Sequence, residues 1–220
     1  MHRLFPALLV ASLLMGAQSW ADDISPAETL LFLDSHLGGV SPPAKLRYRF
    51  AEMIKGAPER KSELELSLQA KADGGCCAVT ADEAGGPAFV VLPPIEEAKS
   101  NPVILYFLER DIRQMQTLTG GQPNYFRRLI RLALAQAAPP RETTVRYRGR
   151  DVSAREILVT PYRDDPRRAQ YPPLAAKTYR FVLAGDVPGG VFLIGTLVPA
   201  EAGSGPPLAQ ALLTLEEPKP

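Results

Sequence analysis

The chain has 220 residues, 45% of them hydrophobic, and its 25 basic and 24 acidic side chains leave a net charge of +1. This length suits one domain or two small ones, and the hydrophobic content excludes a chain that is disordered throughout. The balanced charge gives no strong attraction to nucleic acid or to an anionic membrane, so we expect no nucleic-acid partner.

Residues 1–21 are predicted to be a secretory signal peptide. Arg3 precedes the apolar stretch Leu4–Ala17, and small residues precede a cut between Ala21 and Asp22. The alternative is a transmembrane anchor, but the apolar stretch is shorter than the roughly 20 residues that such a span needs. No Cys lies near the cut, so we expect a periplasmic protein with no stable membrane anchor after cleavage. Removing Arg3 with the peptide balances 24 basic against 24 acidic side chains.

The first part of the mature chain is predicted to change from a helix to strands. Ser25 and Glu28 can form a capping box, which predicts a short helix over 26–37. Apolar residues then alternate with charged residues over 45–50 and with acids and Ser over 63–68, as in half-buried strands. If these two strands pair antiparallel, the row of Arg47 and Arg49 can face Glu63 and Glu65. Two further strands are expected over 76–80 and 88–92.

A helical section follows the first strands. Asn101-Pro102 is typical of a helix start, and the next apolar residues, from Val103 to Met115, lie on one face of a helix. A second helix is predicted over 123–137. Because only the short link around Gly120-Gly121 separates them, the two helices are expected to form an antiparallel pair.

The remainder of the chain is predicted to return to strands, with a polar irregular loop over 161–173. A hairpin turn is expected at Gly149-Arg150 and a type II turn at Pro188-Gly189. The predicted strands cover 144–148, 152–160, 178–184, 191–198 and 211–216.

The order of these elements predicts one α+β domain over 22–220. We expect a curved antiparallel sheet or a partly closed half-barrel. A short N-terminal helix and a central helix pair would pack on one face of that sheet.

Cys76 and Cys77 are the two cysteines of the chain. A strand directs adjacent side chains to opposite faces, which favours two unpaired cysteines that behave as small hydrophobic residues. The alternatives are a disulfide, vicinal or intermolecular, and a thiol site that handles a soft metal or redox equivalents.

His36 is the single histidine of the mature chain. One His without a Cys-x-x-Cys spacing does not suit a zinc site, and no Gly-x-Ser-x-Gly motif accompanies it. We therefore expect His36 to be structural, and we predict no catalytic residue, no metal site and no cofactor.

Arg127, Arg128 and Arg131 place three cations within two turns of the second predicted helix. Such a cluster is either an ordinary solvated face or a surface that docks an acidic partner or a lipid head group. We keep these three residues as a candidate site for a ligand or a partner protein.

The order helix, strands, helix pair and strands over about 25–217 resembles that of the periplasmic half-barrel carriers of lipoproteins and lipids in Gram-negative bacteria. The stretches Asn101–Asp111 and Asp186–Val191 resemble those of uncharacterised exported proteobacterial proteins. The resemblance implies export, and it transfers no site residue to this chain.

Three functions follow as hypotheses. The first is a periplasmic, non-enzymatic binding or carrier protein that holds a hydrophobic small molecule between the curved sheet and the helices. The second is an accessory protein that docks on an envelope protein complex through Arg127, Arg128 and Arg131. The third is a thiol-dependent redox or metal-handling protein that uses Cys76 and Cys77.

Overall fold

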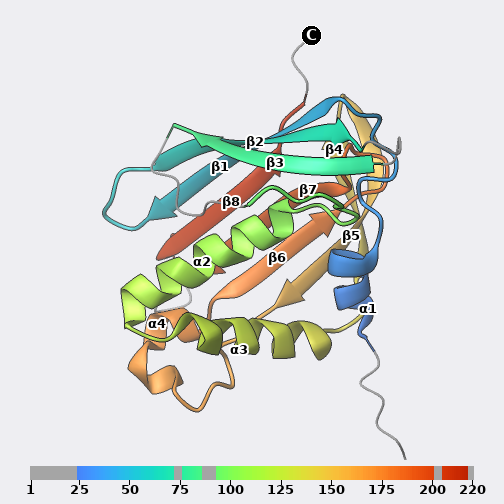
Figure 1. Cartoon of the computed structure of the whole chain (residues 1–220). Coiled ribbons are helices and arrows are strands. Elements are labelled where there is room, and N and C mark those ends of the chain that lie inside the picture. Colours follow the sequence, from blue (N-terminus) through green and yellow to red (C-terminus); the bar gives the residue numbers. More distant parts are fainter. Residues whose placement is uncertain (1–23, 72–75, 86–92, 201–204, 218–220) are drawn as a thin grey trace, which may run out of the picture.

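The computed structural model describes residues 24–71, 76–85, 93–200 and 205–217, which form a curved antiparallel sheet with helices on one face (Figure 1). The predicted signal peptide and the predicted strand over 88–92 lie outside these residues. The predicted α+β fold class is confirmed.

Within the described residues, eight strands form one sheet in the order β3-β2-β1-β8-β7-β6-β5-β4. The first and last strands of the chain, β1 and β8, therefore pair in the middle of the sheet. The strands are β1 (Ala44–Ile54), β2 (Arg60–Ala70), β3 (Cys76–Ala84), β4 (Arg141–Tyr147), β5 (Arg150–Val159), β6 (Thr178–Leu183), β7 (Val191–Val198) and β8 (Ala209–Leu215).

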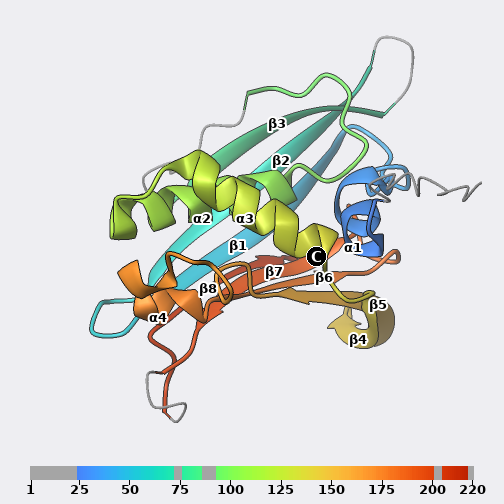
Figure 2. The same ribbon diagram turned by 90° about the horizontal axis from the view of Figure 1, so that it is seen from below.

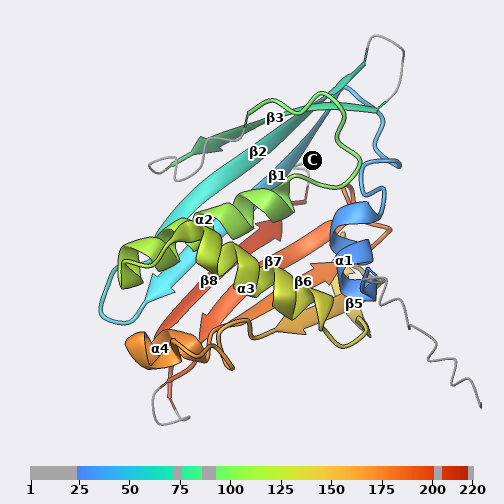
Figure 3. The same cartoon turned by 60° about the horizontal axis from the view of Figure 1, so that its bottom comes forward.

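The segment between β3 and β4 crosses the sheet, because these two strands form its opposite edges. This segment contains α2 (Val103–Thr119) and α3 (Pro123–Ala135). Figure 2 and Figure 3 show both helices, with the N-terminal α1, on the same face of the sheet. The predicted helix pair on one face is confirmed.

The alternation of β1 and β2 gives each strand a buried face and a charged face. Tyr48 and Phe50 of β1 are buried, whereas Arg47 and Arg49 between them are exposed. In the register observed, Arg47 lies opposite Glu65 and Arg49 lies opposite Glu63. The predicted pairing is confirmed, and Arg47 Nε lies 2.9 Å from a carboxylate oxygen of Glu65.

The N-terminal helix is shorter than the predicted 26–37. Ser25 and Glu28 form the predicted capping box at α1 (Pro26–Glu28), which continues as η1 (Thr29–Leu33), a π-helical turn. The chain leaves the helix at Asp34, whose ψ is 140°. The predicted end of this helix was therefore wrong. Leu37 lies beyond the helix and is buried, and its backbone N–H donates a hydrogen bond of 3.2 Å to the Lys99 carbonyl.

Two predictions for the second half need correction. The hairpin turn lies at Arg148-Gly149, whose φ values of 49° and 72° are both positive, as a type I′ turn requires. The segment over 161–173 is not only a polar loop. It includes η2 (Arg168–Gln170) and the start of α4 (Pro172–Ala175), and it buries Tyr162 and Tyr171.

Side chains fill the space between the sheet and the helix pair. Phe107 of α2 packs on Phe50 of β1, with ring centroids 6.4 Å apart. Phe126 of α3 packs edge-on against Tyr162 at 5.8 Å, and Tyr162 packs in turn against Tyr179 of β6 at 6.1 Å. All five rings are at most 2% exposed.

A charged pair lies inside this core. Asp111 of α2 accepts one hydrogen bond from Lys177, which immediately precedes β6, and another from the Tyr179 hydroxyl. The side chains of Asp111 and Lys177 are each only 4% exposed. The Tyr162 hydroxyl adds a hydrogen bond with the Tyr179 hydroxyl at 2.7 Å. Burial and the nearby Asp111 charge both raise the pKa of Tyr179 well above its usual value, so it stays a neutral donor.

Removing one partner of this pair should destabilise the protein strongly. Lys177→Met leaves the Asp111 charge buried without its ammonium partner, which we expect to lower the free energy of unfolding by about 3–5 kcal/mol. Arg146→Gln is the matched control, because it breaks an ion pair with Asp151 whose side chains are 67% and 70% exposed. The control should cost less than about 1 kcal/mol. Urea unfolding measures both, and equal effects would contradict the importance of the buried pair.

Candidate functional site

The three arginines of the predicted site lie on α3, but they have different surroundings. Arg127 forms two hydrogen bonds with Glu109 of α2, from Nε at 2.7 Å and from Nη2 at 2.6 Å. This contact lowers the pKa of Glu109 and ties α3 to α2. Arg127 is therefore part of the helix pair, whereas Arg128 and Arg131 have no carboxylate within ion-pair distance among the described residues.

Arg128 and Arg167 both lie near the ring of Tyr125. The Cζ atom of Arg128 lies 5.5 Å from the ring centroid, and Cζ of Arg167 lies 4.8 Å from it. Arg167 comes from the segment after β5, far away in the sequence. Neither the periodicity of α3 nor any motif indicated that Arg167 would join Arg128.

Asp165 holds this arrangement in place. Its Oδ1 atom accepts hydrogen bonds from the Tyr125 hydroxyl and, at 3.0 Å, from the backbone N–H of Arg167. The residue is 1% exposed. The carboxylate therefore positions the Tyr125 ring and the turn that carries Arg167.

A surface groove of about 720 Å³ begins at these residues and follows α3. One wall is the face of α3 that includes Tyr125, Arg128, Leu129, Leu132 and Ala133. The other wall is formed by residues 158–161 and 164–167. The polar end has Arg128, Arg167 and Asp164, and the apolar wall continues toward Ala137. Since a helix rises 1.5 Å per residue, the wall that α3 forms from Tyr125 to Ala135 is about 15 Å long.

His36 lies in a different place, at a cleft of about 670 Å³ between the N-terminal segment and residues 183–190. Its Nε2 lies 2.8 Å from the Leu30 carbonyl, and its Nδ1 accepts a hydrogen bond of 3.1 Å from the backbone N–H of Asn101. Both contacts are made by a neutral ring that carries its proton on Nε2. Burial lowers the pKa of His36, in keeping with the expected structural role.

Asn101 continues the connection from His36 into the core. Its Oδ1 accepts a hydrogen bond from Val103 N–H at 3.1 Å, at the predicted helix start. Its side-chain amide donates to the Tyr48 hydroxyl and to the Gly189 carbonyl, both at 2.8 Å. The start of α2 is thereby fixed to β1 and to the predicted Pro188-Gly189 turn, where Gly189 has the required positive φ of 74°.

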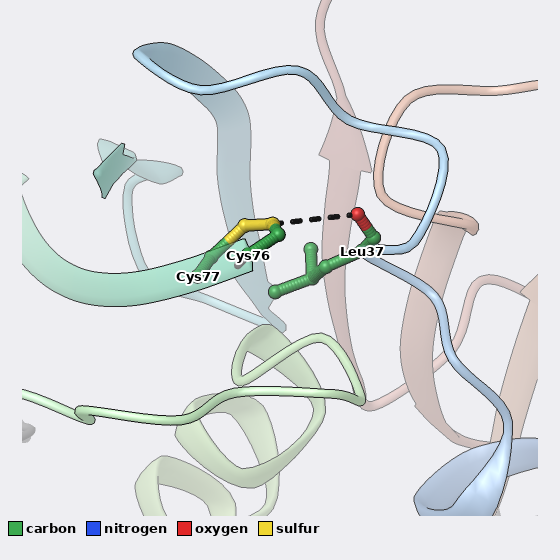
Figure 4. The surroundings of a disulfide bond; sticks show 3 residues. All are labelled: Leu37, Cys76 and Cys77. Carbon is green, nitrogen blue, oxygen red and sulfur yellow. Dashed lines mark hydrogen bonds between the residues drawn. A yellow bond between two sulfur atoms is a disulfide. The ribbon is translucent and has the colours of Figure 1, made fainter. Parts of the chain in front are cut away.

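Cys76 and Cys77 form a vicinal disulfide at the start of β3 (Figure 4). The structure thus adopts one of the alternatives in place of the two unpaired cysteines that we favoured. Cys77 is buried and Cys76 is exposed, with its Sγ 3.6 Å from the Leu37 carbonyl oxygen. In the part of the chain that the structure describes, no three His, Cys, Asp or Glu side chains are arranged to hold a metal.

No helix among the described residues is long and apolar enough to span a lipid bilayer.

Comparisons with known proteins assign no family. No protein-family model matches the chain, and no curated protein matches it. Among solved structures, the crystal structure of the Mycobacterium tuberculosis lipoprotein LppX is similar over 80% of this chain and 86% of that chain. Its sequence identity is 10% and the TM-score is 0.33, so the likeness carries neither a family nor a function to this chain.

The stability of the mature protein should fall when His36 is protonated. The folded state lowers the pKa of His36 below 6.5, so the unfolded chain binds the proton more readily. The free energy of unfolding is therefore expected to decline from pH 7.5 to pH 5.5, by at most about 1.4 kcal/mol per pH unit. His36→Gln should flatten this decline, as measured by urea unfolding at each pH. A wild-type stability that rises on acidification would contradict the assignment.

The disulfide should be present in protein purified after export. We expect an intact mass about 2 Da below that of the dithiol form, and no thiol that reacts with Ellman's reagent in denaturant. Reduction in denaturant should then release two reactive thiols. Two thiols that react without reduction would show that Cys76 and Cys77 are unpaired.

Proposed function

We propose that the chain is an exported, non-enzymatic binding protein that holds an amphipathic small molecule in the groove beside α3. The observation that carries this proposal is the continuity of an apolar helix face with a pair of cations at one end. A volume of about 720 Å³ is also within the range of small-molecule sites.

The groove is a better place for a ligand than the space between the sheet and the helices. The order of elements in the sequence predicted a hydrophobic ligand in that space. In this conformation the space contains the side chains of Tyr48, Phe107 and Phe181, each at most 1% exposed. A ligand there would have to displace packed side chains. The groove needs no such displacement, since Leu132 on its wall is 49% exposed.

The residues of the groove suit binding better than catalysis. The part of its lining that the structure describes contains no Ser, Cys or His, so it offers no Ser–His or Cys–His pair. Asp165 hydrogen-bonds to Tyr125 and to the backbone. The groove therefore offers apolar contact and charge, which are the two requirements for holding an amphipathic molecule.

Export is the second part of the proposal, and it rests on the predicted signal peptide and on the disulfide. Paired cysteines are typical of oxidising compartments such as the periplasm. Cleavage between Ala21 and Asp22 would release a protein with balanced charge.

An uncharged hydrophobic probe should bind in the groove. We expect N-phenyl-1-naphthylamine to bind with a one-to-one stoichiometry and with increased fluorescence. Leu132→Asp should weaken this binding at least tenfold, because it places a charge on the apolar wall. Leu105→Asp is the matched control, since Leu105 of α2 is 48% exposed but does not line the groove. Equal affinity of both variants, or no binding to the wild type, would contradict the proposal.

A further inference from the structure

We infer that the groove beside α3 selects a single-chain amphiphile with an anionic head, held between Arg128 and Arg167. The inference rests on the proposed function and specifies the class of its ligand. The alkyl chain would lie along Leu129, Leu132 and Ala133 of the apolar wall.

Two cations converge at the polar end of the groove. The Cζ atoms of Arg128 and Arg167 lie 5.5 Å and 4.8 Å from the centroid of the Tyr125 ring, so they are at most about 10 Å apart. The Debye length at physiological ionic strength is about 8 Å, so an anion placed between the two guanidinium groups lies close enough to be attracted by both. It would also gain hydrogen bonds to one or both of them.

The two cations are held in position before a ligand arrives. The Tyr125 hydroxyl is fixed by Asp165, and the same carboxylate binds the backbone N–H of Arg167. Less ordering is therefore needed on binding, which favours affinity.

The exposed charge around the head-group position is mostly positive. Asp164 also lines the groove, but no ion pair joins it to Arg128 or Arg167 among the described residues. Asp165 lines the groove as well, but it is 1% exposed and its Oδ1 atom is bound by the Tyr125 hydroxyl and the Arg167 N–H. Arg163 and Arg168 are exposed next to these residues in the sequence, so the exposed side chains at this end favour an anion over a cation.

The apolar wall runs in one direction from the two cations. Leu129, Leu132 and Ala133 follow Arg128 on the groove face of α3, so they extend in one direction from the cations. A head group at Arg128 thus leaves an apolar path for one alkyl chain. A free anion such as acetate would use only the polar end.

Isothermal titration calorimetry on the exported protein can test this assignment with three probes that share a dodecyl or dodecanoyl chain. Dodecanoate is anionic, 1-monododecanoylglycerol is uncharged and dodecyltrimethylammonium is cationic, and each is used below its critical micelle concentration. We expect dodecanoate to bind at least tenfold more tightly than the other two. Millimolar acetate should not compete with it, and competition by acetate would overturn the assignment of an amphiphile.

Paired variants separate a local contact from general charge attraction. The double substitution Arg128→Gln and Arg167→Gln should weaken dodecanoate binding at least tenfold and change binding of the uncharged probe less than twofold. Arg131→Gln is the matched control on the same helix, because Arg131 does not line the groove, and it should change both affinities less than twofold. An equal loss in the control and in the double variant would overturn the inference.

The outcomes also distinguish this inference from the proposed function. If the three probes bind equally and all are weakened by Leu132→Asp, the anionic head is wrong while the groove remains a binding site. If no probe binds, the proposed function fails and the inference fails with it.

Discussion

The charge of Asp111 is tolerated inside the protein only because Lys177 and Tyr179 bind it there. Asp111 belongs to α2, whereas Lys177 immediately precedes β6 and Tyr179 belongs to it, so this requirement fixes the helix pair over the sheet. The contacts continue through Tyr162 to Phe126 of α3. The wall of the groove is thus positioned by a buried ion pair that lies outside the groove itself.

A second set of polar contacts fixes α2 to the other half of the sheet. Gln114 donates to Glu52 of β1 at 2.6 Å, and Arg110 lies 3.7 Å above the Phe50 ring. The Tyr106 hydroxyl donates to Glu83 of β3. Because α2 is held at both halves of the sheet, the interior is closed by protein side chains. Among the described residues, the groove face of α3 is joined to the opposite wall by the hydrogen bond between Tyr125 and Asp165 at one end, and the groove is open beyond that contact.

The sequence predicted those parts of the fold that depend on local patterns. Alternation identified β1 and β2 and their facing charges, and the Ser25 capping box identified the first helix. The pair of Asp111 and Lys177 could not be predicted, because the residues are 66 positions apart and no local pattern connects them. The same holds for the groove. Arg127 and Arg128 look alike in the sequence, but adjacent helix positions point about 100° apart, so one meets Glu109 and the other faces the groove.

The ligand is expected to lie beside α3 and not under the helix pair. A crystal structure of the exported protein with bound dodecanoate is the most direct test. We expect the carboxylate to lie within ion-pair distance of Arg128 and Arg167, with the chain along Leu129 and Leu132. We also expect the contact between Asp111 and Lys177 to be unchanged. A chain found between α2 and the sheet, with that contact broken, would show that the ligand site is elsewhere.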